Sequence, residues 1–221
     1  MEELRYYNMM MKRFWFSVLL AACAGGVLGQ GIDYNILCSL QQRRTTTMDQ
    51  TMRWVSNSLI LAPMVPATLA LGGWIGNNDE LLHSSGQMGA SLLATGGITL
   101  GLKYGVKRLR PYQKYPDDLI SVTQEPDPSF PSGHTSFAFS TAVSMCLQYP
   151  RWYVVAPSLI WASAVGFSRL YLGVHFPSDV LTGMLIGSLS ACITYQIEQQ
   201  RLSQKSIPQP KVMLPAIRVV F

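Results

Sequence analysis

Charged residues are scarce in this sequence of 221 amino acids. Asp, Glu, Lys and Arg make up 13% of the chain, against 48% hydrophobic residues, whereas soluble domains carry roughly 25% charged residues. This deficit argues against a soluble protein and favours one that lies in a lipid bilayer. The net charge of +5 does not indicate a nucleic-acid partner, because the basic residues do not gather in one stripe.

Cysteine is also rare, and its spacing argues against a metal site. The four cysteines are Cys23, Cys38, Cys146 and Cys192. None lies in a CxxC pair or beside a pair of histidines, which are the patterns that zinc sites require. We therefore expect no metal and no cofactor. Cys146 and Cys192 fall in apolar segments, where cysteine acts as a small packing residue, and the pairing of Cys38 stays open.

The sequence has no strand-like alternation and no internal repeat; it has long apolar runs instead. These runs cover residues 58–75, 87–106, 135–149, 152–167 and 180–197. Helices satisfy their own backbone hydrogen bonds inside a bilayer, so we predict an all-α fold, a polytopic transmembrane bundle of five to six helices. Pro63 and Pro66 are expected to bend the first run. Gly97 and Gly101, at GxxxG spacing, are expected to let neighbouring helices approach closely.

The N-terminal segment, residues 1–29, has the layout of a secretory signal. Lys12 and Arg13 precede a short apolar core that ends in small residues. Three interpretations stay open: a cleaved signal, a retained first membrane helix, or a lipoprotein modified at Cys23. Each places the following residues outside the cytoplasm. The polar segment 33–56 is expected to form a short interfacial helix. The main helical domain is assigned to residues 30–197, and 198–221 to a basic cytoplasmic tail.

The first of three motifs is K-x6-RP, formed by Lys103, Arg110 and Pro111. Seven positions on a continuing helix make about two turns, so we expect Lys103 and Arg110 to share a face, with Lys107 between them and the helix ending at Pro111. Such cations can clamp a phosphate. The neighbouring cations are interpreted as groups that reach the lipid headgroups: Lys107, Arg108 and Lys114.

The second motif is PSGH, Pro131 to His134, ahead of an apolar run. Ser132 is a plausible N-cap, and Gly133 lets the backbone approach a ligand. The backbone N–H groups at such a helix start favour anions. The imidazole of His134 titrates near neutrality, so it can pass a proton to a leaving group. Alone, the tetrapeptide is a weak signal, and its default interpretation is a capping turn with a surface histidine.

The third motif is SR-x5-H-x3-D, from Ser168 and Arg169 to His175 and Asp179. Pro177 suits the first turn of a helix. A carboxylate four positions after His175 can fix the tautomer of its ring and leave the other nitrogen free as a nucleophile. The alternative is that Asp179 caps a helix and His175 is an interfacial residue.

Together the three motifs resemble, at every defining position and spacing from Lys103 to Asp179, those of the type 2 phosphatidic acid phosphatase superfamily. The resemblance implies that His175 attacks phosphorus, that Asp179 orients His175, and that His134 protonates the leaving group and then activates water. It assigns the phosphate-binding role to a set of five residues: Lys103, Arg110, Ser132, Gly133 and Arg169. It requires no metal, and His83 receives no role.

The resulting hypothesis is a membrane phosphatase that hydrolyses a lipid phosphate or diphosphate through a phosphohistidine. Undecaprenyl diphosphate, phosphatidylglycerophosphate, phosphatidic acid and lipid A phosphate all stay open as substrates, with a preference for an envelope lipid. Alternating the predicted spans from a cytoplasmic N-terminus brings the motifs to the outer face of a bacterial inner membrane. The acidic, proline-rich loop 116–128 is expected to bear on headgroup choice. Two alternatives are a vanadium haloperoxidase-like enzyme and a non-catalytic lipid-phosphate binding or transport protein; the oligomeric state stays open.

Overall fold

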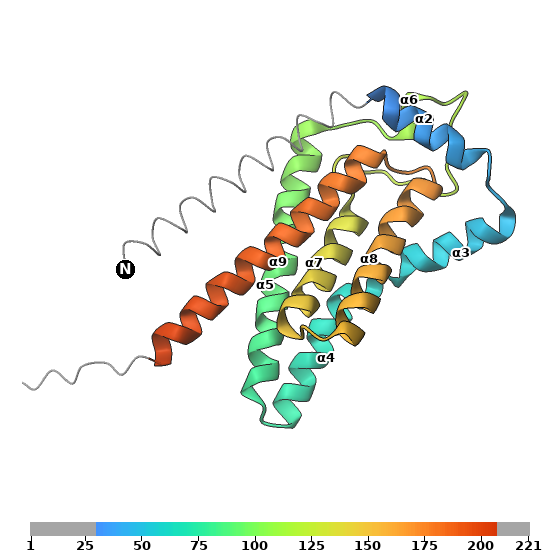
Figure 1. Ribbon diagram of the computed structural model, residues 1–221. Coiled ribbons are helices and arrows are strands. Elements are labelled where there is room, and N and C mark those ends of the chain that lie inside the picture. The colour runs from blue at the N-terminus through green and yellow to red at the C-terminus, as the bar shows by residue number, and fades with distance from the viewer. Residues whose placement is uncertain (1–29, 207–221) are drawn as a thin grey trace, which may run out of the picture.

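The computed structural model describes residues 30–206, and all regular elements in this range are helical (Figure 1). In chain order they are α2 (Gln30–Gln41), α3 (Thr46–Asn57), the 3-10 turn η1 (Ser58–Ile60), α4 (Leu61–Ile75), α5 (Asp79–Val106), α6 (Pro111–Lys114), α7 (Gly133–Gln148), α8 (Trp152–Tyr171) and α9 (Pro177–Ser206). The all-α prediction is confirmed for this part of the chain. The signal-like segment 1–29 and residues 207–221 of the predicted tail lie outside the described residues.

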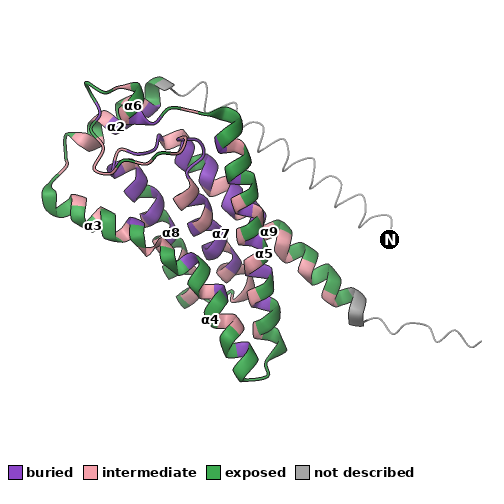
Figure 2. Cartoon of the chain, turned by 180° about the vertical axis from the view of Figure 1, so that it is seen from behind, coloured by how far each residue is buried: buried purple, intermediate pink, exposed green. Residues whose placement is uncertain are grey.

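Helix α7 is the centre of the bundle, packed against α5, α8 and α9 (Figure 1). Figure 2 shows that buried residues concentrate in α7 and on the helices that enclose it. Small polar side chains fill much of this interface, and Ser91 and Ser140 share a hydrogen bond of 2.7 Å between their hydroxyls. A helix enclosed by protein on several sides does not need a continuous apolar surface. This explains why α7 is rich in Ser and Thr.

Three helical segments are long and apolar enough to cross a membrane: Thr46–Ile75, Trp152–Tyr171 and Pro177–Ser203. Their outer faces expose large apolar side chains, including Ile60 and Trp152, as expected of surfaces in contact with lipid. The predicted spans at 87–106 and 135–149 are helical as α5 and α7. Neither of these two helices meets the same criterion of length and hydropathy among the described residues.

The glycines that allow close helix packing are not those predicted. A Cβ added at Gly97 or Gly101 would meet no atom within 4 Å. The close approach is instead between α9 and α7: a Cβ at Gly187 would collide with the carbonyl oxygen of Ser136, and one at Gly183 would lie 2.6 Å from the carbonyl oxygen of Ser132. Small residues do let helices approach closely in this bundle, but at Gly183 and Gly187 and not at Gly97 and Gly101.

Several predicted boundaries also change. Helix α5 ends at Val106, where Lys107 adopts a left-handed conformation with φ 52°, and Pro111 begins the short helix α6 rather than ending α5. The segment 33–56 contains two helices, α2 and α3, instead of one. In the run where Pro63 and Pro66 were expected to cause a bend, the departure from a regular α-helix is the 3-10 turn η1, which lies before both prolines. Helix α9 runs through Glu198 to Ser206, so the predicted tail begins inside a helix.

Candidate active site

Four helix ends meet at one end of the bundle and bring the three motifs together (Figure 1). They are the C-terminal ends of α5 and α8 and the N-terminal ends of α7 and α9, overlaid by α2, α6 and the loop between α6 and α7. The arrangement follows from the alternating direction of successive long helices. Residues more than seventy positions apart in the sequence, from Lys103 to Asp179, therefore share one region.

Lys103 and Arg110 do converge, although not on a continuing helix as predicted. The chain turns at Lys107, and both side chains reach Asp127 in the loop before α7: Lys103 Nζ lies 2.6 Å from Asp127 Oδ2, and Arg110 Nη2 lies 2.8 Å from Asp127 Oδ1. Arg110 is fully buried and also pairs with Glu125 at 2.7 Å. The K-x6-RP spacing therefore gives a shared target rather than a shared helical face.

Arg169, at the end of α8, completes this cationic group. Its Nη1 donates to Ser56 Oγ at 2.5 Å, and its Nη2 pairs with Glu125 Oε1. Arg169 is only 2% exposed, and its Nε has no partner among the described residues. Guanidinium groups held in this way keep a fixed direction, and a bound anion would compete with Glu125 and Asp127 for their N–H groups. The cluster of Lys103, Arg110 and Arg169, with Glu125 and Asp127, is called the clamp below.

Ser132 and Gly133 lie beside the clamp at the start of α7. Ser132 is in the N-cap position, as predicted, but its fully buried hydroxyl meets Thr135 Oγ1 at 3.0 Å instead of capping the backbone. A Cβ added at Gly133 would lie 3.9 Å from Lys103 Cε, an ordinary contact distance. The backbone of this turn is thus adjacent to Lys103, and its N–H groups are at the positive end of a helix dipole.

His175 is buried between Asp179 and the clamp. Its Nδ1 lies 3.7 Å from Asp179 Oδ2, longer than a hydrogen bond. Its Nε2 lies 3.4 Å from Arg110 Nη1 and 4.0 Å from Glu125 Oε2. One nitrogen therefore faces the carboxylate and the other faces the clamp. This is the orientation in which Nε2 can attack an anion held by Arg110.

Burial and charge set the protonation of the groups around His175. Burial, with the charges of Arg169 and Arg110, lowers the pKa of His175 to about 4 against the opposing effect of Asp179. Burial alone would raise the pKa of Glu125, but the charges of Arg169 and Arg110 outweigh it and hold that pKa below its ordinary value. The imidazole is thus neutral at neutral pH, as a nucleophile requires, while Glu125 is ionised.

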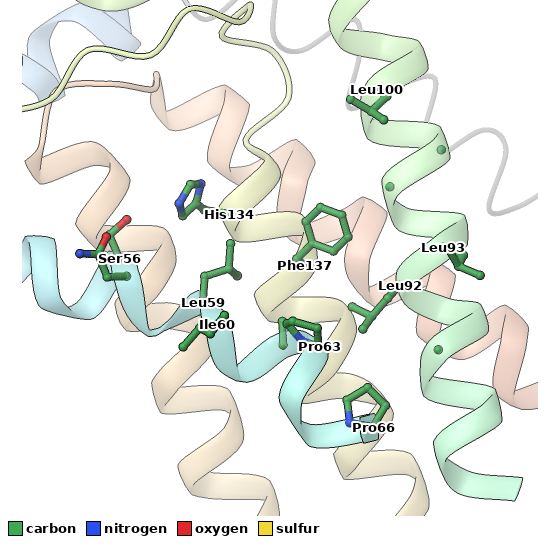
Figure 3. Close-up of a pocket in the computed structure, with 15 residues that line it drawn as sticks. Ser56, Leu59, Ile60, Pro63, Pro66, Leu92, Leu93, Leu100, His134 and Phe137 are labelled. Carbon is green, nitrogen blue, oxygen red and sulfur yellow. The ribbon is translucent and has the colours of Figure 1, made fainter. Parts of the chain in front are cut away.

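His134 lies where the clamp meets an apolar cavity. The cavity has a volume of about 970 Å³ and is lined by parts of α3, η1, α4, α5 and α7. Figure 3 shows His134 at the same end of this cavity as Ser56, with Phe137, Leu59 and Pro63 further along it. His134 interacts electrostatically with Glu125 and His175, and Ser56 accepts a hydrogen bond from Arg169. The second predicted histidine is therefore close to the clamp.

The sequence interpretation missed Arg108, which was assigned to lipid headgroups. Its side chain is only 14% exposed, and Nη1 lies 2.6 Å from Asp179 Oδ1 while Nη2 lies 2.9 Å from Asp33 Oδ2. Ser129 was also missed; its hydroxyl donates to Asp179 Oδ2 at 2.6 Å. The sequence shows only that Arg108 lies two positions before Arg110. That spacing does not indicate that Arg108 pairs with Asp33 of α2. Lys107 and Leu109 beside Arg108 are exposed.

Acidic residues of the loop 116–128 were expected to influence headgroup choice. In the structure Glu125 and Asp127 are the counterions of the clamp. Within residues 30–206, no group of three or more His, Cys, Asp or Glu side chains has an arrangement suited to a metal ion. The cations at this site are the side chains of Lys103, Arg110 and Arg169.

Comparison with known proteins decides the family. The family model described as PAP2 superfamily matches residues 85–203, which include all three motifs. The chain belongs to the PAP2 superfamily. The resemblance that the motifs indicated is thereby confirmed, and the PAP2 match extends over most of α5, all of α6, α7 and α8, and most of α9.

Three curated relatives similar to this chain are phosphatases by name. The chain is 26% identical over 197 residues to an undecaprenyl-diphosphatase of Sulfolobus acidocaldarius, covering 87% of this chain and 91% of the relative. It is 30% identical over 172 residues to a lipid A 1-phosphatase of Porphyromonas gingivalis, covering 75% of this chain but 36% of that protein. A third match, 46% identical over 61 residues, is phosphatidylglycerophosphatase B of Escherichia coli, covering 26% of this chain and 24% of the relative.

Solved structures show the same PAP2 fold. A PAP2-type phosphatidylglycerolphosphate phosphatase from Bacillus subtilis superimposes with a TM-score of 0.63 at 23% identity, over 88% of this chain and 97% of that one. LpxE of Aquifex aeolicus superimposes with a TM-score of 0.62 at 22% identity, over 73% of this chain and 93% of that one. The protein thus shares its helical fold with these two PAP2 structures.

Proposed function

We propose that this protein is a membrane phosphatase that removes a phosphate group from a lipid phosphate or diphosphate through a phosphohistidine. The observation that supports this most directly is the orientation of His175, whose Nε2 faces Arg110 while Nδ1 faces Asp179. Family membership supports the reaction class, and the relatives named above act on different lipids. The substrate is therefore proposed here as a class.

In the first step, Nε2 of His175 attacks phosphorus and a P–N bond forms as the bond to the lipid oxygen breaks. His134 donates its proton to the departing oxygen; burial lowers the pKa of this imidazole to about 4, and the negative charge of a bound phosphate favours its protonated form. Lys103, Arg110 and Arg169, with the backbone of Ser132 and Gly133, stabilise the charge on the transferring phosphoryl group. This role for fixed cations is why the proposed mechanism uses no metal ion.

In the second step, water attacks phosphorus and the P–N bond breaks. His134, now neutral, accepts the proton from water, and the electron pair of the P–N bond returns to His175. Inorganic phosphate leaves and both imidazoles regain their starting states. Asp179 remains ionised throughout and stabilises the ring of His175 on its Nδ1 side.

The apolar cavity beside His134 supports a lipid rather than a water-soluble substrate. It begins at His134 and at Ser56, the partner of Arg169, and runs between α4, α5 and α7. Its walls include Leu92, Leu93 and Leu100 (Figure 3). A phosphate bound in the clamp would therefore place an attached hydrocarbon chain in apolar surroundings, where its burial is favourable. The candidates are undecaprenyl diphosphate, phosphatidylglycerophosphate, phosphatidic acid and lipid A phosphate.

We further propose a multi-pass arrangement in a bacterial inner membrane, with the clamp at the outer face. The three candidate spans and the exposed apolar surface support insertion, and the signal-like N-terminal sequence favours this orientation. Each long helix reverses the direction of the chain, so the loop 76–78 and the clamp would lie at opposite faces. Labelling single introduced cysteines at Asn77 and Lys114 in intact cells, in a background without native cysteines, tests this; outside labelling of Asn77→Cys would reverse the orientation.

The function itself is tested with purified protein in detergent. Phosphate release is measured from the four lipid phosphates, with and without a chelator, for the native protein and His175→Ala. We expect release from at least one lipid, insensitive to the chelator and absent in the variant. Retained activity in His175→Ala would overturn the assignment of the nucleophile, and loss with the chelator would overturn the metal-free mechanism.

A further inference from the structure

Asp33 of α2 is a buried carboxylate that contacts the start of α9. It is 3% exposed. Its Oδ1 accepts a hydrogen bond from the backbone N–H of Ser178 at 3.0 Å, and its Oδ2 accepts one from the Ser178 hydroxyl at 2.5 Å. The two residues are 145 positions apart. A buried carboxylate is costly unless it is paired and hydrogen-bonded, so this contact is specific to the folded arrangement.

Arg108 joins Asp33 to Asp179. Its Nη2 donates to Asp33 Oδ2 at 2.9 Å, and its Nη1 donates to Asp179 Oδ1 at 2.6 Å and to Ser178 Oγ at 2.7 Å. The guanidinium carbon lies 4.2 Å from the ring centroid of Phe176. A planar guanidinium with two anionic partners and an aromatic face has little freedom to rotate. The guanidinium of Arg108 is therefore held in place by contacts with α2, with α9 and with the ring of Phe176.

Asp179 is in turn fixed by this network. Its Oδ1 is occupied by Arg108, while its Oδ2 accepts hydrogen bonds from Ser129 Oγ at 2.6 Å and from the backbone N–H of Phe176 at 2.9 Å. The same Oδ2 is the atom nearest His175 Nδ1. With Oδ1 held, the carboxylate cannot rotate to exchange its oxygens. The charge and direction of the group behind the nucleophile thus depend on Arg108.

We propose that Asp33 and Arg108 are positioning residues that hold Asp179, and through it His175, for attack on phosphorus. The inference rests on the proposed function, because it assumes that His175 is the nucleophile. Arg108 occupies an undefined position of K-x6-RP, and Asp33 lies before the residues matched by the family model. On this account α2 is part of the active centre and not only an interfacial helix.

A purely structural role predicts different behaviour. If Asp33 and Arg108 only attached α2 to the bundle, their loss would lower stability and leave the turnover of each folded molecule unchanged. If they position Asp179, kcat falls while KM, which depends on the clamp and the apolar cavity, changes little. The ratio of the two effects on kcat and KM therefore separates the two roles.

The variants are Asp33→Asn, Arg108→Gln, Arg108→Lys and the double variant Asp33→Asn with Arg108→Gln. Matched controls are Lys107→Gln, an exposed neighbouring cation, and Asp49→Asn, whose ion pair with Arg44 at 3.2 Å does not touch the site. Each is measured as folded, monodisperse protein with a fixed lipid phosphate. We expect kcat to fall at least tenfold in Asp33→Asn and in Arg108→Gln, with KM within about twofold of the native value. Arg108→Lys is expected to lose less kcat than Arg108→Gln.

Coupling provides the second readout. Because Asp33 acts through Arg108, the double variant is expected to lose little more activity than Arg108→Gln alone, whereas independent roles would multiply the losses. Where Asp33→Asn or Arg108→Gln does not yield folded protein, Ser178→Ala removes one hydroxyl contact of each and is expected to lower kcat about threefold.

The outcomes distinguish this inference from the proposed function. Activity remaining in His175→Ala overturns the proposed function itself. An inactive His175→Ala, with native kcat in Asp33→Asn, Arg108→Gln and Ser178→Ala, overturns only the positioning role. Equal loss in the two controls would also overturn it, since no side-chain hydrogen bond or ion pair joins either control residue to Asp33, Arg108 or Asp179 in the described part of the chain.

Discussion

Arg110 and Glu125 form an ion pair of 2.7 Å at the position where the phosphate of a substrate is proposed to bind. Glu125 also pairs with Arg169 and lies 4.0 Å from Nε2 of His175. Asp127 holds Lys103 and Arg110 in the same way. The carboxylates of this loop and the phosphate of a substrate therefore compete for the same cations.

Removing one of these negative charges is expected to strengthen phosphate binding. In Glu125→Gln the side chain keeps its shape but loses its charge, so inorganic phosphate or orthovanadate should inhibit at about fivefold lower concentration. That factor corresponds to roughly 1 kcal/mol, the value of a partly exposed ion pair. Inhibition constants for the native protein, Glu125→Gln and Asp127→Asn test it, with Asp117→Asn as the control from the same loop. Unchanged or weaker inhibition in both clamp variants would contradict competition.

The pH dependence follows from the low pKa of His175, about 4. The nucleophile must be neutral, and a depressed pKa keeps it neutral down to that pH. On the acid side of the pH profile, kcat/KM should therefore fall as His175 is protonated near pH 4, and not near 6.5, the ordinary pKa of histidine. The measurement compares a lipid monophosphate with a lipid diphosphate. If the midpoint of the acid-side fall differs between the two substrates, it reflects ionisation of the substrate. A midpoint near 6.5 for both substrates would contradict the prediction.

Gly187 tests the packing of the bundle. A Cβ there would lie 2.7 Å from the backbone nitrogen of Ser140 as well as meeting the Ser136 carbonyl oxygen, so α7 and α9 must separate in Gly187→Ala. We expect a loss of stability of about 3 kcal/mol and a lower thermal unfolding temperature in detergent. Gly97→Ala, where the added Cβ meets nothing within 4 Å, should be neutral or slightly stabilising, as alanine favours helices. Equal stability of the two variants would refute the close approach.

The apolar cavity predicts a substitution that discriminates between substrates. Gly97 lines the cavity and has open space at its Cβ, so Gly97→Leu should occupy volume without disturbing the fold. KM for a long-chain lipid phosphate should rise about tenfold, equivalent to losing the burial of roughly two methylene groups. A short water-soluble phosphate ester should be hydrolysed as before. Gly101→Leu, outside the cavity, is the control, and equal effects on both substrates would argue against a chain-binding role.

The sequence predicted much of the helical fold because apolar runs and end signals are local. Pro177, which suits the first turn of a helix, does begin α9. Helix α5 begins at Asp79, before the predicted run at 87, and the local signal for it is Asn78, whose side chain accepts a hydrogen bond from the backbone N–H of Leu81. The end of α5 was misplaced because the turn depends on Lys107 in a left-handed conformation. Lysine has no preference for the left-handed conformation, so the sequence does not indicate this turn.

The candidate site was predictable only where its residues follow a fixed spacing. His175 and Asp179, four positions apart, are such a pair. The contact from Asp33 to Arg108 depends on how α2 docks above α9, and the burial of Arg108 depends on Phe176 and Asp179 closing over it. Such long-range contacts are set by tertiary packing, which a single sequence does not show. The match of Glu125 to the clamp was unforeseen for the same reason.

The most direct test of the account is to locate the phosphoryl group on the enzyme. His134→Ala should attack a phosphate ester with a good leaving group, which needs no proton donor, but should hydrolyse the intermediate slowly. We therefore expect an acid-labile phosphoryl group to accumulate on the peptide containing His175, detected by mass spectrometry, and to be absent from the double variant with His175→Ala. A phosphoryl group on any other residue would contradict the account, and so would turnover at the native rate by the double variant His134→Ala with His175→Ala.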